Sequence, residues 1–156
     1  MTAHGTHEDT YGVAGAVVVG VDGSDSSRDA LIWAAEHAHL AGRRLVAITA
    51  WELPASYGAI VGWSGGVNFE QDARTILSES VAKSLGDEGA LKLTQKVIHS
   101  HPAPVLVEAS KHAALVVVGC RGHGEFSGML LGSVSQYLAT HAECPVVIVR
   151  HREPRD

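Results

Sequence analysis

Short, continuously apolar segments rich in valine recur along the chain, and they constrain the fold more than any other feature. They read AVVVGVD at 16–22, LVAITAW at 45–51, LVVVG at 115–119 and PVVIV at 145–149. Segments that are apolar on both faces are typical of parallel strands buried on each side. Because one parallel strand reaches the next only through a crossover connection, usually a helix, the chain is expected to alternate strands with helices.

The segments between these strands have helical spacing. Apolar residues recur at helical intervals over 26–41, where Gly42 is a stop signal, and again after Asn68, a residue type that often caps a helix start. We expect the second of these helices to end at the glycines within 86–89. Two further helices are expected over 104–113, with Pro104 near the first turn, and over 133–142.

Residues 91–99 differ from the other strand segments because apolar and polar side chains alternate along them. Alternation indicates a strand with one face in water, which belongs at a sheet edge. We therefore predict an α/β fold, a doubly wound five-stranded parallel sheet with strand order 3-2-1-4-5 and helices on both faces. One domain over 15–151 is expected between a mobile N-terminal tail, 1–14, and a charged tail, 152–156.

Composition narrows the class of partner. The chain has 156 residues, 46% of them hydrophobic, and 12 Lys and Arg against 17 Asp and Glu give a formal charge of −5. An acidic balance argues against a nucleic-acid partner. The longest apolar runs are far below the ~20 residues that cross a bilayer, so no membrane partner is expected. The first residues lack the basic start and apolar core of a signal peptide, and we expect a cytoplasmic protein.

A ligand site is expected where the winding of the sheet reverses, beyond the ends of the first and fourth strands. The first strand ends at Asp22 and the fourth at Gly119, after which the sequence gives Gly122, nine residues, Gly132 and Ser133 at a helix start. Glycines let backbone N–H groups approach an anion, and a helix start supplies unpaired donors. This run predicts a phosphate site, although each glycine alone reads equally well as a turn and Ser133 as a cap.

Two further positions extend the predicted site. The Asp22 carboxylate would repel phosphate but accepts hydrogen bonds from sugar hydroxyls, so it suits a ribose. The backbone near Ala50, at the end of the second strand, would meet the edge of a base. Base, sugar and phosphates would then lie across the second, first and fourth strands.

The chain resembles the universal stress protein family over residues 16–150. The segments VVGVDGSDSS and LLGSVSQYLATHAECPVVIVR and the glycine run carry the resemblance. It implies ATP binding, with or without Mg²⁺, and a homodimer joined through the last strand, which begins at Pro145 and ends at Val149. It also implies that Asp22 meets the ribose and Ala50 the adenine. The positions implied to line the phosphates and ribose are Gly119, Gly122, Gly132, Ser133 and Val134.

The sequence departs from the family pattern in two places. HSHPAP stands where a glycine more often precedes the helix, and the glycine-rich loop between Pro54 and Val67, which could serve as a lid, differs in length. Neither departure touches the phosphate motif.

Catalysis has little support in the sequence. No GK followed by Ser or Thr places a lysine on the terminal phosphates, and no GxSxG elbow exposes a serine nucleophile. We assign no catalytic residue and no metal ligand; at most a slow ATPase would use Glu125 or His123. Cys120 and Cys144 are expected about 15 Å apart, too far for a disulfide.

Three functions remain open. The first is a cytoplasmic ATP-binding stress-response regulator that acts as a nucleotide-dependent switch. The second is a dimeric interaction scaffold whose glycine run is only a turn. The third is a binder of cyclic AMP or AMP, because the glycines read phosphate but not the number of phosphates.

Overall fold

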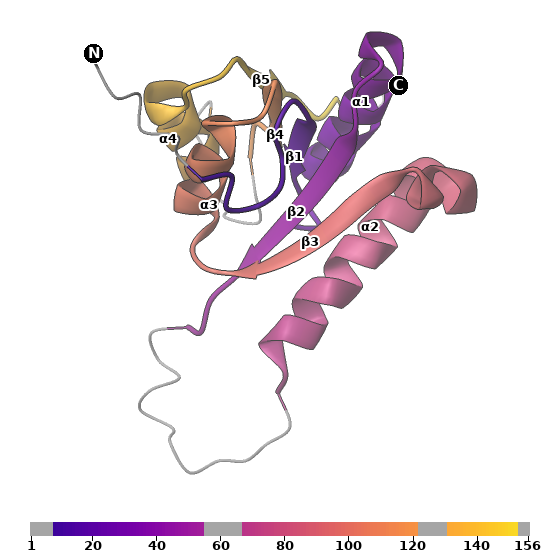
Figure 1. The fold of residues 1–156 in the computed structure, drawn as a ribbon. Coiled ribbons are helices and arrows are strands. Elements are labelled where there is room, and N and C mark those ends of the chain that lie inside the picture. Colours follow the sequence, from indigo (N-terminus) through magenta and orange to yellow (C-terminus); the bar gives the residue numbers. More distant parts are fainter. Residues whose placement is uncertain (1–7, 55–66, 122–130, 153–156) are drawn as a thin grey trace.

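The computed structural model describes residues 8–54, 67–121 and 131–152. Strands and helices alternate along this part of the chain (Figure 1). The strands are β1 Val17–Gly20, β2 Leu45–Trp51, β3 Leu93–His99, β4 Leu115–Gly119 and β5 Val146–Val149. The helices are α1 Asp25–Ala41, α2 Phe69–Leu91, α3 Pro102–Ser110 and α4 Ser133–His141.

The strands form one parallel sheet in the order β3-β2-β1-β4-β5, which confirms the predicted fold. In the register of the sheet, Val17 of β1 lies beside Leu45 of β2 and Leu115 of β4. The strands therefore run together, and their carboxyl ends lie along one edge. The winding direction reverses between β1 and β4, at the middle of that edge.

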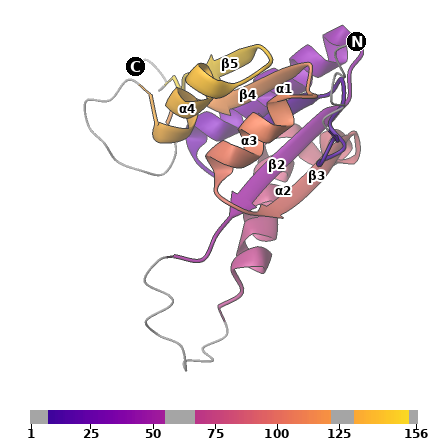
Figure 2. The ribbon, with the colours of Figure 1, turned by 60° about the vertical axis from the view of Figure 1, so that its left-hand side comes forward.

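Helices cover both faces of the sheet, as predicted (Figures 1 and 2). Val17 and Val19 of β1 pack in one core with buried residues of α1 and α2. Val18 packs in a second core with α3 and α4. Successive side chains of a strand point to opposite faces, so a solidly apolar strand supplies both cores at once.

The edge position of β3 is also confirmed. Its side chains are exposed or half-buried, whereas Val17, Val18 and Val19 of β1 are completely buried. β5 forms the other edge, and all of its residues are half-buried.

Local chemistry sets the helix starts. Asn68 caps α2 as predicted, because its side chain accepts a hydrogen bond from the Gln71 N–H at 3.0 Å. Ser24 caps α1 in the same way through the Ser27 N–H. Gly42 ends α1 with a φ of 64°, in the left-handed region that favours glycine.

Several predicted boundaries were wrong. The second helix does not end at Gly86: a φ of 69° and ψ of −179° kink the chain there, and helical turns resume as far as Leu91. The third strand therefore starts at Leu93 instead of residue 91. The third helix begins at Pro102, because proline is tolerated at a first helical position, and it ends at Ser110.

Residues 9–14, which we expected within the mobile N-terminal tail, pack against the domain. Val13 is completely buried in the core beneath α3 and α4. The Asp9 carboxylate accepts hydrogen bonds from the N–H groups of Val13 and Ala14 at 3.0 and 2.8 Å.

Within the described ranges, no helix has the length and apolar character needed to cross a membrane.

Candidate nucleotide site at the carboxyl edge of the sheet

A cavity of about 480 Å³ opens at the carboxyl edge of the sheet, where the winding reverses between β1 and β4. Small-molecule sites usually enclose about 300 to 1,000 Å³. Six of the seven predicted site residues line this cavity: Asp22, Ala50, Gly119, Gly132, Ser133 and Val134. The seventh, Gly122, lies outside the described residues, as do His123, Glu125 and the predicted lid between Pro54 and Val67 except for its two ends.

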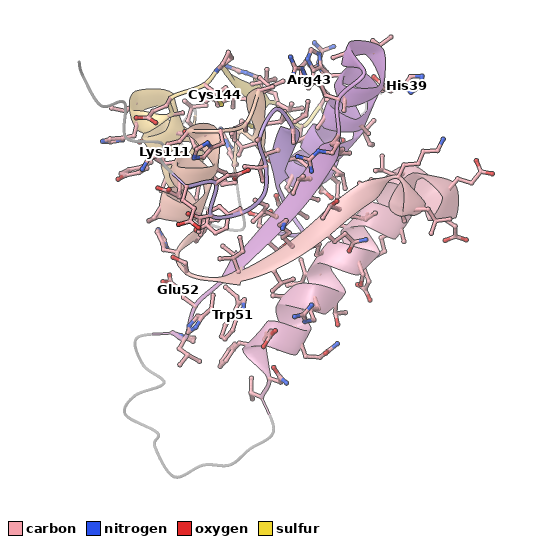
Figure 3. All side chains as sticks on the ribbon, viewed as in Figure 1. His39, Arg43, Trp51, Glu52, Lys111 and Cys144 are labelled. Carbon is pink, nitrogen blue, oxygen red and sulfur yellow. The ribbon has the colours of Figure 1, made fainter. Side chains whose placement is uncertain are left out.

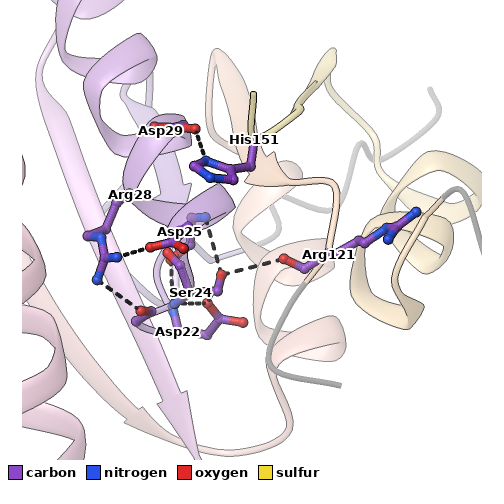
Figure 4. Close-up of polar contacts among 9 residues, drawn as sticks. Asp22, Ser24, Asp25, Arg28, Asp29, Arg121 and His151 are labelled. Carbon is purple, nitrogen blue, oxygen red and sulfur yellow. Dashed lines mark hydrogen bonds and ion pairs between the residues drawn. The ribbon is translucent and has the colours of Figure 1, made fainter. Parts of the chain in front are cut away.

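Asp22 follows β1 and is held by the turn into α1 (Figure 4). Its Oδ1 atom accepts hydrogen bonds from the backbone N–H of Ser24, at 2.9 Å, and from the Ser24 hydroxyl. The Asp22 N–H donates to the Ser27 hydroxyl at 3.4 Å. The carboxylate is thus fixed at the cavity wall before any ligand arrives.

Gly119 has a structural role that the glycine motif alone does not reveal. A Cβ atom at this position would lie 2.7 Å from the Ser26 carbonyl carbon and 2.8 Å from the Ser27 nitrogen. Both neighbours are backbone atoms in the first turn of α1, so they cannot move aside independently. Glycine is needed here so that α1 can cross the end of β4 closely.

The same crossing is closed by hydrogen bonds at the next residues. The Ser26 hydroxyl donates to the Arg121 carbonyl, and the Arg121 N–H lies 3.4 Å from the Ser26 hydroxyl oxygen. Figure 4 shows the Arg121 side chain extending from the end of β4 toward α4. The first turn of α1 therefore fixes the backbone from which the Arg121 guanidinium projects.

The start of α4 presents backbone donors to the cavity. The first helical hydrogen bond runs from the Gln136 N–H to the Gly132 carbonyl at 3.0 Å. The N–H groups of Ser133, Val134 and Ser135 precede that bond and thus have no acceptor within the helix. A helix start of this kind attracts anions through its donors and its dipole.

The helix starts at Ser133, as predicted, but Ser133 is not its cap. The cap is Gly132, without a side-chain hydrogen bond, and Ser133 is the first helical residue. The Gly132 N–H donates to the Cys120 carbonyl at 2.6 Å, which ties α4 to the end of β4. Gly132 therefore serves the fold through its own amide, and the donors that face the cavity come from the residues after it.

Sequence reasoning missed two charged or titratable side chains on the cavity wall, Arg121 and His101. Arg121 lies between the glycines of the predicted motif, so the position of that motif could have indicated it. His101 precedes α3, and its Nδ1 atom lies 3.0 Å from Oε1 of Glu52. That pair joins two loops that are distant in sequence, so no local sequence pattern indicates it.

The two ends of the cavity differ in chemistry. Ile48, Ala50, Pro102 and Leu106 give one end an apolar lining. The other end has the N–H groups at the start of α4 and the cationic Arg121. Such a cavity suits a flat heterocycle joined to an anionic group.

Among the residues that the structure describes, no three His, Cys, Asp or Glu side chains gather as a metal site, and both cysteines are free.

Comparisons with known proteins show what this chain is similar to. The model of the universal stress protein family matches residues 15–150. A universal stress protein of Mycobacterium tuberculosis is 36% identical over 143 residues, which cover 88% of this chain and 48% of that protein. The chain spans about half the length of the curated relatives it matches.

Two solved structures are similar to this chain over nearly their whole length. A universal stress protein in complex with cyclic AMP has 31% sequence identity and a TM-score of 0.55, covering 88% of this chain and 97% of that one. A universal stress protein from Lactobacillus plantarum has 20% identity and a TM-score of 0.66, covering 88% and 99%. At that lower identity the likeness shows the shared fold.

Proposed function

The chain belongs to the universal stress protein family, and we propose that it is a stress-response regulator that binds ATP in the cavity between β1 and β4. The base would lie against Ala50, the ribose would bond to the Asp22 carboxylate, and the phosphates would meet the start of α4. Gly122 belongs to the proposed phosphate loop with Gly119 and Gly132.

The observation that carries the proposal is the set of hydrogen-bond donors at the start of α4, beside Arg121 on the cavity wall. Three consecutive N–H groups precede the first helical hydrogen bond of α4, and Arg121 lines the same wall. Hydrogen bonds to a charged partner contribute about 1.5 to 3 kcal/mol each, more than neutral ones. Several such donors at one end favour a ligand with several negative charges over one with a single charge.

A specific comparison supports a second candidate. The 31% identical relative was solved with cyclic AMP, which shares the adenine and ribose of ATP but carries one phosphate. Cyclic AMP would use the same apolar end and only part of the anionic end. The two candidates therefore differ at the phosphates, where the number of charges decides between them.

Binding, more than turnover, is the proposed activity. The sequence has no GK followed by Ser or Thr, so no lysine of that motif neutralises the terminal phosphates during transfer. We propose that nucleotide occupancy changes the partner or assembly state of the protein in the cytoplasm. Mg²⁺ would accompany ATP as its ordinary counter-ion.

The proposed assembly is a homodimer through β5. This strand is a sheet edge with half-buried apolar side chains, and an open edge offers unpaired backbone groups to another strand. A second copy of the chain would cover that edge. A scaffold function without nucleotide would use the same surface.

Calorimetric titration of ATP, AMP and cyclic AMP into the purified chain separates these candidates. We expect saturable binding of ATP, about tenfold or more tighter than that of AMP, because ATP gives the helix start and Arg121 more charge to bind. Tighter binding of cyclic AMP than of ATP would establish the second candidate. A folded dimer that binds none of the three nucleotides would leave the scaffold function as the remaining candidate.

A further inference from the structure

His101 lines the cavity together with apolar side chains, and its imidazole can read hydrogen-bonding groups. Ile48, Ala50 and Leu106 supply carbon surface there, and His101 is the imidazole beside them. Apolar walls hold a flat base without distinguishing its edge groups. A polar side chain at this end would therefore add to what the backbone near Ala50 reads, and would affect which base is preferred.

The position of His101 is fixed from two sides. The residue caps α3 without a side-chain bond to the helix, so its ring is not used as a cap. Its Nδ1 atom instead pairs with Oε1 of Glu52 at 3.0 Å. Figure 3 shows Glu52 and Trp51 at the carboxyl end of β2. Trp51 stacks on His99, with ring centroids 4.1 Å apart, so the ends of β2 and β3 are joined beside the pair.

The Glu52 carboxylate sets the hydrogen-bonding character of the ring. A carboxylate only accepts, so the neutral imidazole carries its proton on Nδ1 and donates it to Glu52. The other nitrogen, Nε2, is then an acceptor. No protein group within the described ranges bonds to Nε2, and the side chain remains 54% exposed.

We propose that His101 selects the base of the bound nucleotide, with Nε2 accepting a hydrogen bond from an exocyclic amino group. This inference rests on the proposed nucleotide site. It assigns part of the preference for an amino purine over an oxo purine to one side chain, because an oxo group would place an acceptor against an acceptor. Glu52 acts through His101 and is a positioning residue.

The test compares ATP with purine riboside triphosphate, which lacks only the amino group, and with inosine triphosphate, which has an oxo group. For the wild-type chain we expect ATP to bind about 3- to 10-fold more tightly than purine riboside triphosphate, the effect of one hydrogen bond, and inosine triphosphate to bind most weakly. In His101→Phe the ratio of ATP to purine riboside triphosphate should fall toward 1, while purine riboside triphosphate retains its affinity.

Two controls keep the result interpretable. His39→Phe makes the same substitution on α1, far from Glu52 in Figure 3, and should keep the wild-type ratio. Glu52→Gln retains the size of the side chain but removes the carboxylate, and should lower the ratio by part of the His101→Phe effect.

The outcomes separate this inference from the proposed function. A wild-type chain that binds none of the triphosphates overturns both. A wild-type chain that binds ATP, together with a His101→Phe variant that keeps the full ratio, overturns the role of His101 and leaves the nucleotide site standing. If His101→Phe does not fold, a ratio unchanged by Glu52→Gln overturns it equally.

Discussion

Gly119 lies where the first turn of α1 crosses the end of β4, and its missing side chain lets the two backbones approach. We predict that Gly119→Ala destabilises the protein by about 1 to 3 kcal/mol, because the added Cβ would lie 2.7 Å from the backbone of Ser26. Denaturant unfolding measures the change. Adding Ser26→Ala should not restore stability, since backbone atoms still obstruct the Cβ; wild-type stability in Gly119→Ala would contradict the packing role.

At the residue scale, the sequence predicted positions better than roles. Asp22 and Ala50 line the cavity because strand ends can be read from apolar runs, and parallel strands bring those ends to one edge. The packing of Gly119 against α1 and the use of the Gly132 N–H by Cys120 depend on tertiary contacts. The pairing of His101 with Glu52 joins residues 49 positions apart, which no local spacing encodes.

At the scale of elements, residues 9–14 form a segment held against the start of the sheet. The Asp9 carboxylate bonds to the N–H groups of Val13 and Ala14, and Arg44 donates to the Gly12 and Ala14 carbonyls. The hydrogen bond from Val13 is the main cause that holds the pKa of Asp9 below its ordinary value. These contacts keep Val13 in the core.

The lowered pKa of Asp9 gives a signed prediction for stability. A carboxylate whose pKa is lower in the folded state stabilises the fold above the unfolded pKa, about 3.9, and loses that contribution as the pH falls through the folded pKa. Asp9→Asn should therefore be less stable than the wild type at neutral pH. The difference in the free energy of unfolding should shrink below about pH 4. An equal difference at both pH values would contradict this account.

The ends of elements were harder to predict than their existence. The glycine signal at 86 is real, because its φ of 69° breaks the helical geometry, but the chain resumes helical turns beyond it. Leu91, expected as the first apolar residue of a strand, ends the helix and is 87% exposed. A kink and a stop have the same local signature, and packing of the following residues decides between them.

At the scale of the whole molecule, the strand order could be predicted because the strand segments have two different hydrophobic patterns. Solidly apolar strands must be covered on both faces, and the alternating strand must lie at an edge, which leaves few doubly wound arrangements. That arrangement places the cavity between β1 and β4. The dimer through β5 stays a prediction, because a single chain shows the edge strand but not a second chain paired with it.

The measurement that tests the nucleotide site most directly is the ATP affinity of a matched pair of variants at the start of α4. Ser133→Pro removes one backbone donor, yet proline fits a first helical position, and the preceding Gly132 has the extended ψ of 169° that proline requires. Ser133→Ala removes the hydroxyl and keeps the N–H.

If the N–H groups at the start of α4 hold the phosphates, calorimetry should show saturable ATP binding to the wild type and near wild-type affinity in Ser133→Ala. Ser133→Pro should bind ATP at least about tenfold more weakly, because it loses one hydrogen bond to a charged group. Equal ATP affinity in all three folded proteins, or no binding to the wild type, would contradict the account.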